Sequence, residues 1–224
     1  MACKRDQVLL ELAGKQHDVV ARRQLVAAGV SRSAIQHALD SRRLFRTEWR
    51  GVYATRPRLG RYGRLMAAVL WAGPGAVVSH ETAGAELWEV TKRRSGTIHL
   101  SVPAARKPRS RRGVVVHRRT LSSKDVTRQR GIPATTPLRT IIDLAAGARE
   151  RRDAERLIDE ADARNLLRAD TLRERLAHEH GRGVPLLATS STATRSCSPT
   201  RTSSGYSCHS RARRACRRRH PRRS

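Results

Sequence analysis

Hydrophobic residues recur at helical spacing in three short segments near the start of the chain. The first segment, residues 6–13, is rich in Leu and Val and ends before a glycine. The second, residues 21–28, ends before Gly29, and glycine readily adopts the left-handed conformation that closes a helix. The third, residues 31–40, begins at Ser31, whose hydroxyl can cap the free amides of a new helix. The pattern predicts a helix-turn-helix with a supporting helix behind it.

The residues after this motif mix aromatic, aliphatic and basic side chains. The stretch FRTEWRGVYA, residues 45–54, has a glycine near its middle and predicts a short β-hairpin. A hairpin in this position is the wing of a winged helix-turn-helix. The basic, turn-rich stretch RPRLGR follows at residues 56–61. We therefore expect residues 1–58 to form a winged helix-turn-helix DNA-binding domain.

The patterns further along predict a small mixed α/β domain over residues 59–182, so the fold class is α+β. A helix is expected at residues 62–72, where Gly-Pro provides a stop. A second helix is expected to follow Ser79, with Ser79 as its cap. The adjacent pair Ser79–His80 does not indicate catalysis. A nucleophile and its base usually come from separate segments and need a third, orienting group.

Two β-branched runs and three later helical patterns complete this domain. Residues 97–103 and 114–119 predict two antiparallel strands joined by a basic loop, which is either a phosphate contact or a solvated loop. His117 is expected to be an ordinary strand residue with a satisfied hydrogen bond, not a metal ligand. A helix with Thr136 as its cap and Pro137 in its first turn should run to Ala146. Two more amphipathic helices are expected at residues 151–167 and 170–180.

Charge limits the class of partner. The formal net charge is +28, and no apolar run is long enough to cross a membrane. Such an excess of basic residues favours a polyanion, and double-stranded DNA is the expected partner. The start of the chain lacks the pattern of a signal peptide, so a cytoplasmic location is expected. The four cysteines have no CxxC spacing, so neither a disulfide framework, a metal site nor a cofactor is indicated.

The polar face of the third predicted helix is expected to contact base edges, because Arg can pair with guanine and Gln with adenine in the major groove. Basic side chains around it and in the wing are expected to contact phosphates. The alternative is that these are solvated charges on an ordinary small helical domain. The residues expected to bind DNA at or near base edges are Ser31, Arg32, Ser33, Gln36 and His37, and those expected at phosphates are Arg22, Arg23, Arg42, Arg43, Arg46 and Arg50.

The end of the chain differs in composition from everything before it. Residues 183–224 contain 10 Arg and no Asp or Glu, and they have no Leu, Ile, Val or Phe after Leu187. Such a segment cannot build a core, and we expect a disordered basic tail. Its composition, rich in Arg, Ser, Thr, Pro and Cys, is also what translation of a GC-rich gene in a shifted reading frame yields. A basic arm that binds DNA is the other interpretation.

In combination, several motifs resemble a known family. The chain is similar to the winged-helix antitoxins of type IV toxin–antitoxin systems, called AbiEi-like, particularly actinobacterial members. The resemblance covers about residues 6–182 and implies a winged helix that binds the promoter of its own operon. It also implies a following domain with antitoxin function, and a toxin encoded nearby that is countered without direct contact. The matching stretches are QLVAAGVSRSAIQHAL, RGVYA, AAVLWAGPGAVVSHETAGAELW and GIPATTPLRTIIDLA.

Two other functions stay open at this point. Many similar proteins continue into a nuclease-like domain resembling very-short-patch repair endonucleases. Under this alternative, the chain is a truncated or frameshifted member of that nuclease-fused family. No Asp or Glu follows Glu179, so the carboxylates that such a nuclease needs for its metal are absent there. The remaining alternative is a basic protein that binds nucleic acid without selectivity.

Overall fold

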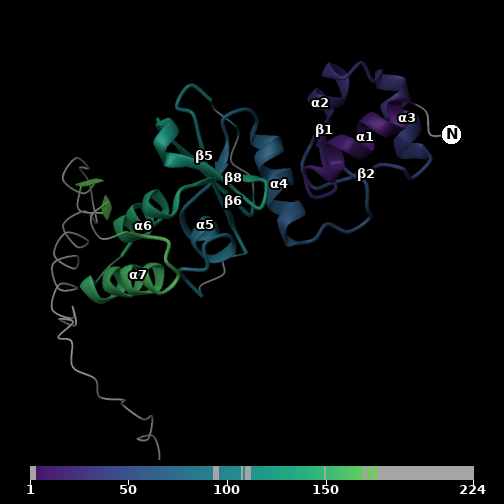
Figure 1. Ribbon diagram of the computed structural model, residues 1–224. Coiled ribbons are helices and arrows are strands. Elements are labelled where there is room, and N and C mark those ends of the chain that lie inside the picture. Colours follow the sequence, from purple (N-terminus) through teal and green to yellow (C-terminus); the bar gives the residue numbers. More distant parts are fainter. Residues whose placement is uncertain are drawn as a thin grey trace, which may run out of the picture.

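The computed structural model describes residues 4–92, 96–106, 108, 112–148, 150–168, 171–172 and 174–175. The expected tail at residues 183–224 and most of the expected helix at 170–180 lie outside this part of the chain. Figure 1 shows the order of the elements in space. In chain order they are α1 (Lys4–Gly14), β1 (Val19–Ala21), α2 (Arg22–Ala27), α3 (Arg32–Asp40), β2 (Phe45–Arg46), β3 (Val52–Ala54), α4 (Arg61–Ala72), β4 (Val77–Val78), α5 (His80–Glu86), β5 (Ile98–Val102), β6 (Val114–Arg118), the 3-10 turn η1 (Ser123–Asp125), β7 (Val126–Gln129), β8 (Ile132–Thr135), α6 (Pro137–Ala146) and α7 (Arg151–Ala163).

The predicted helix-turn-helix is confirmed. Gly29 has a φ of 80°, the left-handed conformation expected at the turn between α2 and α3. Val30 is buried immediately after it. The Ser31 side chain accepts a hydrogen bond from the Ala34 backbone amide at 3.1 Å and caps α3. Ile35 of α3 is buried, so the apolar stripe of this helix packs inward as its spacing predicts.

The predicted wing is also present, and it belongs to a small sheet that the sequence did not fully indicate. Strands β2 and β3 pair antiparallel, and β1, which was not predicted, pairs antiparallel with the other edge of β3. Side chains alternate along these strands: Val20 and Tyr53 pack against the helices of the winged helix. Val19 and Val52 point the other way, into a separate hydrophobic core that also contains the apolar face of α4.

Helix α4 therefore lies between the two parts of the molecule (Figure 1). It is buried over most of its length, including Leu65, Met66 and Val69. On one side it contacts β1 and β3 of the small sheet, and on the other it contacts the larger sheet. The predicted domain boundary near residue 58 stays a prediction, and across it the apolar contacts are continuous.

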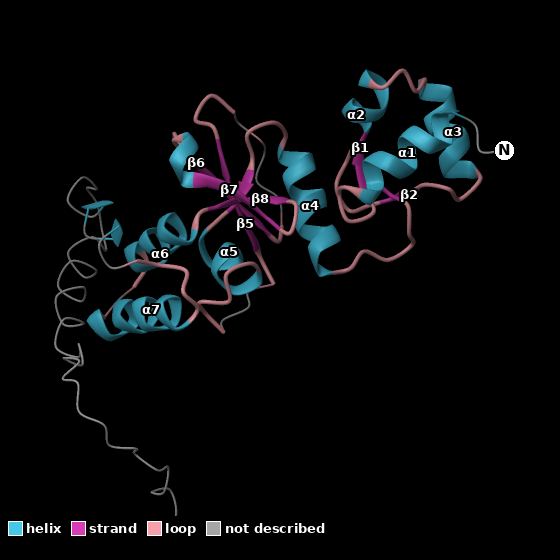
Figure 2. Cartoon of the chain, viewed as in Figure 1, coloured by secondary structure: helices cyan, strands magenta, loops and turns pink. Residues whose placement is uncertain are grey.

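The larger sheet has five strands among the described residues, in the order β6-β5-β4-β8-β7. The cartoon shows it between α4 and the group formed by α5, α6 and α7 (Figure 2). The expected antiparallel pairing of the two β-branched runs is wrong, because β5 and β6 are parallel, with Ile98 opposite Val114. Strand β4 pairs antiparallel with one edge of β5, and β6 lies on the opposite edge. A parallel pair cannot be closed by a hairpin turn, so the segment between Val102 and Val114 is a crossover connection and not the expected hairpin loop.

A second hairpin, β7–β8, was not predicted. Its two-residue turn is Arg130–Gly131, and both residues have positive φ values of 51° and 77°, as tight hairpin turns require. The expectation for the helix at 137–146 is confirmed: the Thr136 side chain accepts a hydrogen bond from the Arg139 amide, and Pro137 is in the first turn. Helix α7 ends at Ala163, earlier than expected.

The expected cap of α5 is wrong in its chemistry. Ser79 holds the N-cap position, but its side chain makes no cap hydrogen bond. The Ser79 Oγ instead accepts a hydrogen bond from the Ser101 hydroxyl at 2.8 Å and lies 3.0 Å from Nδ1 of His80. None of the helices in the described part of the chain combines the length and the hydropathy that a bilayer crossing needs.

Candidate nucleic-acid interface

The outward face of α3 carries the polar residues that the sequence singled out. Arg32, Ser33, Gln36 and His37 are all exposed, and Ser33 shares a hydrogen bond with the capping Ser31 at 2.9 Å. Gln36 donates from Nε2 to the Asp40 carboxylate one turn later, at 2.7 Å. This bond uses one of the two Nε2 hydrogens, and the other hydrogen and Oε1 are the groups that a base contact needs.

The wing brings three of the predicted phosphate ligands together. Arg22, Arg46 and Arg50 line one hollow of ≈ 590 Å³, whose remaining walls are Thr47, Trp49 and residues 51–53 of the wing. Arg22 is the first residue of α2, and its backbone amide donates to the Gly51 carbonyl at 2.8 Å, which ties the helix to the hairpin. The hollow has three guanidinium groups and no acidic side chain among its lining residues, so it suits an anionic group such as a phosphate.

The other predicted residues fall in three different places. Ser33, His37 and Arg43 line a second hollow of ≈ 410 Å³ whose floor is the apolar core under α3. Arg42 is exposed in the loop after α3 and has a positive φ of 56°. Arg23 points away from the wing hollow and donates from Nη1 to the Leu70 carbonyl of α4. One donor of Arg23 is thus used to hold the winged helix against α4.

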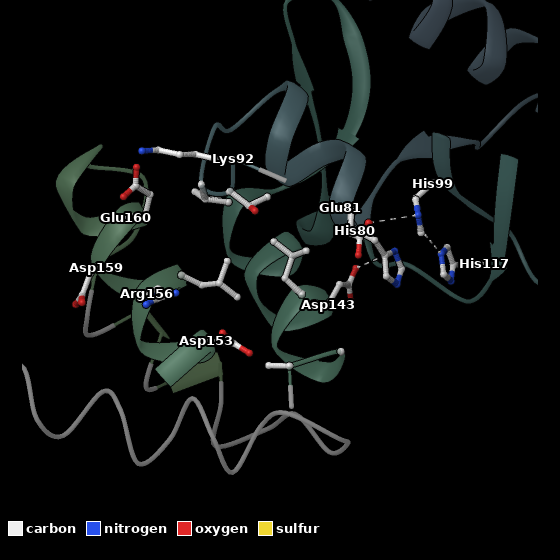
Figure 3. A pocket seen from close by; sticks show the side chains of 16 residues that line it. His80, Glu81, Lys92, His99, His117, Asp143, Asp153, Arg156, Asp159 and Glu160 are labelled. Atoms are coloured by element: carbon white, nitrogen blue, oxygen red, sulfur yellow. Dashed lines mark hydrogen bonds and ion pairs between the residues drawn. The ribbon is translucent and has the colours of Figure 1, made fainter. Parts of the chain in front are cut away.

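A cluster of histidines was not identified from the sequence as one site. His80 follows β4, His99 lies in β5 and His117 in β6, and all three line a cavity of ≈ 870 Å³ (Figure 3). The rings of His80 and His117 stack with centroids 3.6 Å apart. No signal in the sequence pairs His99 with His117, because they share a face only through the register that places Ser101 opposite His117.

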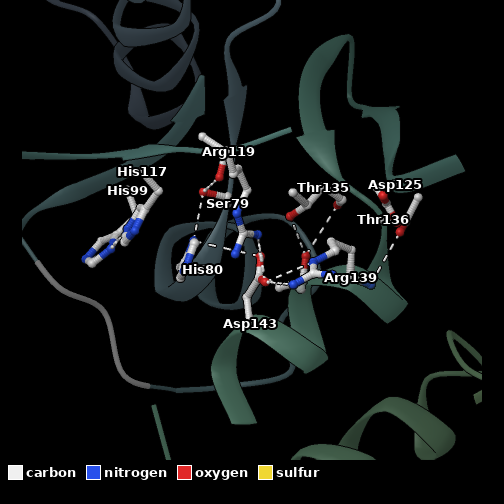
Figure 4. A network of polar contacts seen from close by, with 12 residues as sticks. Ser79, His80, His99, His117, Arg119, Asp125, Thr135, Thr136, Arg139 and Asp143 are labelled. Carbon is white, nitrogen blue, oxygen red and sulfur yellow. Dashed lines mark hydrogen bonds and ion pairs between the residues drawn. The ribbon is translucent and has the colours of Figure 1, made fainter. Parts of the chain in front are cut away.

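A buried carboxylate supports this cluster from α6. Asp143 has a side chain with no exposed surface, and both of its oxygens accept hydrogen bonds from Arg119 at 2.7 Å (Figure 4). Arg139, one turn earlier in α6, also donates to Asp143 at 2.7 and 2.9 Å. The carboxylate is therefore neutralised by two guanidinium groups, as a buried charge requires.

Burial shifts the pKa of each of the three imidazoles downwards. It lowers the pKa of His80 to about 3, although the nearby Asp143 carboxylate opposes this shift. Burial also lowers the pKa of His99, against the effect of Glu81, and that of His117, with a further contribution from His99. Nδ1 of His99 and Nε2 of His117 share a hydrogen bond, so one of these two nitrogens is its acceptor.

The geometry around Ser79 does not match a hydrolytic relay. Both the Ser79 hydroxyl and the Asp143 carboxylate lie nearest to the same nitrogen of His80, Nδ1, at 3.0 and 3.9 Å. A relay needs the hydroxyl on one ring nitrogen and the carboxylate on the other. Ser79 is also completely buried, so its oxygen is out of reach of a substrate.

Two family models match the chain in succession. The model described as "Transcriptional regulator, AbiEi antitoxin" matches residues 7–56, and the model described as "AbiEi antitoxin C-terminal domain" matches residues 76–183. The chain belongs to the AbiEi antitoxin family. The AbiEi regulator domain thus corresponds to the winged helix, and the AbiEi C-terminal domain begins just before β4 and includes the histidine cluster.

More distant comparisons add little to this assignment. No curated protein matches the chain. Among solved structures, it is similar to the crystal structure of the RV2827C protein from Mycobacterium tuberculosis, with 18% sequence identity and a TM-score of 0.49. That likeness covers 85% of this chain and 78% of the other, and at this level it carries no inference about function.

Proposed function

We propose that this AbiEi protein is a sequence-selective regulator that binds double-stranded DNA through α3 and the wing. The observation that carries the proposal is the pairing of two surfaces on one small domain. One is the exposed polar face of α3, and the other is the three-guanidinium hollow formed by Arg22, Arg46 and Arg50. A helix of this kind reads base edges, and a cationic hollow beside it fixes the register on the phosphate backbone.

The two surfaces have different expected energetics. Phosphate contacts contribute affinity that falls with salt and is the same for every sequence. Base contacts by Arg32 and Gln36 contribute the discrimination between sequences, about 1 to 3 kcal/mol for each good contact. The net charge of +28 adds to attraction over longer distances and raises the rate of encounter with DNA.

The proposed biological role is supported by the family. We propose that the protein binds the promoter of its own operon and counters a toxin encoded nearby, in the cytoplasm, without direct contact between the two proteins. Support comes from the descriptions of the two matched models, both of which are antitoxin models. No observation favours the alternative of a nuclease-fused protein. We assign the antitoxin function to the mixed α/β domain that follows the winged helix.

The test is a binding assay with the DNA upstream of the gene. The full chain should bind this DNA in the presence of excess bulk DNA, and Gln36→Ala should lose about 1 to 3 kcal/mol of discrimination at one base position. Gln7→Ala, an exposed change of the same type in α1, is the matched control and should keep wild-type discrimination. Equal affinity of the wild-type protein for all DNA sequences would contradict the proposal.

The antitoxin role needs a separate measurement, because a DNA-binding protein could lack it. Expression of the neighbouring gene alone should arrest growth, and co-expression of this protein should restore it. The variant Arg50→Ala should lose promoter repression and still restore growth when expressed from an unrelated promoter. If growth is restored only by variants that bind DNA, the proposed division between the two domains is wrong.

A further inference from the structure

The histidine cluster has no part in the proposed DNA binding, and its chemistry suggests a ligand of its own. The three imidazoles reach one place from separate elements: the start of α5, the middle of β5 and the end of β6 (Figure 3). His80 holds its position with a left-handed backbone, at φ 51°, directly after β4. Such strain in a residue other than glycine concentrates at functional sites and needs support from its surroundings.

Two nitrogens in the cluster face each other at a spacing that suits a metal ion. His99 Nδ1 and His117 Nε2 lie 3.2 Å apart, and their ring centroids lie 5.5 Å apart. Two nitrogens bound to one tetrahedral zinc ion, each at about 2.0 to 2.1 Å, are separated by about 3.3 Å. An ion can therefore replace the single proton that these two nitrogens otherwise share, with little movement of either strand.

The opposite nitrogens of two rings have carboxylates nearby. Nε2 of His99 lies 3.9 Å from Glu81, and Nδ1 of His80 lies 3.9 Å from Asp143 and 3.0 Å from the Ser79 hydroxyl. Metal-bound imidazoles usually give their second N–H to a carboxylate or another acceptor, which fixes the tautomer. Figure 4 shows His80 beside Ser79 and Asp143, and the tautomer that binds a metal through Nε2 has its proton on Nδ1, on the side of these two acceptors.

The third ligand requires one movement. In the part of the chain that the structure describes, no three such groups already converge on one point, because the ring of His80 lies flat on that of His117 at an angle of 10°. Rotation of the His80 side chain out of this stack brings its Nε2 towards the facing pair. The cavity of ≈ 870 Å³ beside the cluster leaves room for that rotation and for a water molecule as fourth ligand.

We propose that His80, His99 and His117 bind a divalent transition-metal ion of the zinc type, with Glu81 and Asp143 orienting the rings. Imidazole nitrogen selects ions such as Zn²⁺, Co²⁺ or Ni²⁺ over Mg²⁺ and Ca²⁺, which prefer oxygen.

The experiment uses Co²⁺ as a spectroscopic probe, since the cysteines elsewhere in the chain could also bind metal. The full chain, freed of metal with a chelator, should bind one Co²⁺ with the visible bands of a nitrogen- and oxygen-ligated ion and without the near-ultraviolet band of a thiolate ligand. His99→Ala and His117→Ala should each weaken binding at least a hundredfold. His17→Ala, a histidine outside the cluster, should leave it unchanged.

A second variant separates metal binding from folding. Glu81→Gln keeps the shape of a half-exposed side chain and should weaken Co²⁺ binding about tenfold while leaving the circular dichroism spectrum unchanged. Zn²⁺ should compete with Co²⁺ and raise the melting temperature of the wild-type protein more than that of Glu81→Gln, and much more than that of His99→Ala. A thiolate band, no saturable binding, or equal affinity in wild type and His99→Ala would overturn the proposal.

Discussion

The indole rings of Trp49 and Trp71 lie 5.2 Å apart at an angle of 44°, and this contact joins the wing to α4. Trp49 is buried and Trp71 is half-buried, so the pair contributes apolar burial as well as favourable ring geometry. The contact connects the module that is proposed to bind DNA with the domain to which the antitoxin role is assigned.

The first prediction concerns this contact. Trp71→Ala should reduce the free energy of unfolding by roughly 2 kcal/mol, because a partly buried indole is removed and its neighbour gains exposure. Denaturant unfolding followed by circular dichroism measures the change. Leu10→Ala, which truncates a side chain that is 60% exposed, is the control and should change stability by less than about 0.5 kcal/mol. Equal effects of the two substitutions would argue that the indole contact contributes nothing.

The second prediction separates phosphate from base contacts. Arg50→Ala should weaken binding to every DNA sequence and lower the slope of log affinity against log salt by about one unit. Arg46→Ala, from the same hollow, should behave alike. Titrations at several salt concentrations give the slope. Arg152→Ala in α7 is the control, since this exposed guanidinium lies far along the chain in the other domain. A loss of discrimination in Arg50→Ala would place its side chain at a base.

The third prediction is a pH dependence of stability. Burial of Asp125 raises the pKa of its carboxyl, but hydrogen bonds from the Ser122 hydroxyl and amide, together with Arg175 and Arg139, outweigh this, and the pKa is lowered overall. Because the pKa of Asp125 is lower in the folded protein, its ionised carboxylate contributes to the free energy of unfolding. This contribution is complete above the unfolded pKa of about 3.9 and is lost as pH falls through the folded pKa.

The test of this dependence compares Asp125→Asn with the wild type. The variant should be less stable at pH 6, and the difference in unfolding free energy should shrink as the pH is lowered below about 4. Asp162→Asn, at an exposed position of α7, is the control and should show no such convergence. A difference that stays constant from pH 6 to pH 3 would mean that the charge on Asp125 is not what stabilises the turn.

The fourth prediction ranks two neighbours on α7. Ile158 is buried in the core, whereas Leu157 is half-buried and lines the large cavity. Ile158→Asp should therefore lower the melting temperature much more than Leu157→Asp, because the unpaired carboxylate is forced into the core only at position 158. Thermal melts of both variants decide the order. If Leu157→Asp were the more damaging, α7 would be rotated relative to the structure.

The sequence was sufficient where the structure depends on local chemistry. A glycine at φ 80°, a serine that caps and an apolar stripe of period 3.6 define α2, the turn and α3 within a few residues of one another. The capping of α6 by Thr136 was predictable for the same reason. Local signals of this kind do not depend on the rest of the fold.

The histidine cluster depends instead on pairing between distant segments. His99 and His117 come together only because β5 and β6 are parallel, and an antiparallel pairing would give a different alignment. Arg139 lies one turn before Asp143 in the same helix, so this pairing follows from helical spacing alone. The other partner, Arg119, is the residue after β6, and its pairing depends on the tertiary fold. Strand direction and register are set by the whole sheet, so no single stretch of sequence carries that information.

Strands β1 and β3 of the small sheet are buried on both faces, against the helices of the winged helix on one side and against α4 on the other. The winged helix is therefore packed against the rest of the protein and is not joined to it by a flexible linker. If α3 binds DNA as proposed, the body of the protein sets the angle at which this helix enters the groove. On a palindromic operator, the spacing of the two half-sites would then report how two copies of the whole molecule sit beside each other. Any ligand that shifts α4 would alter that spacing as a rigid rotation.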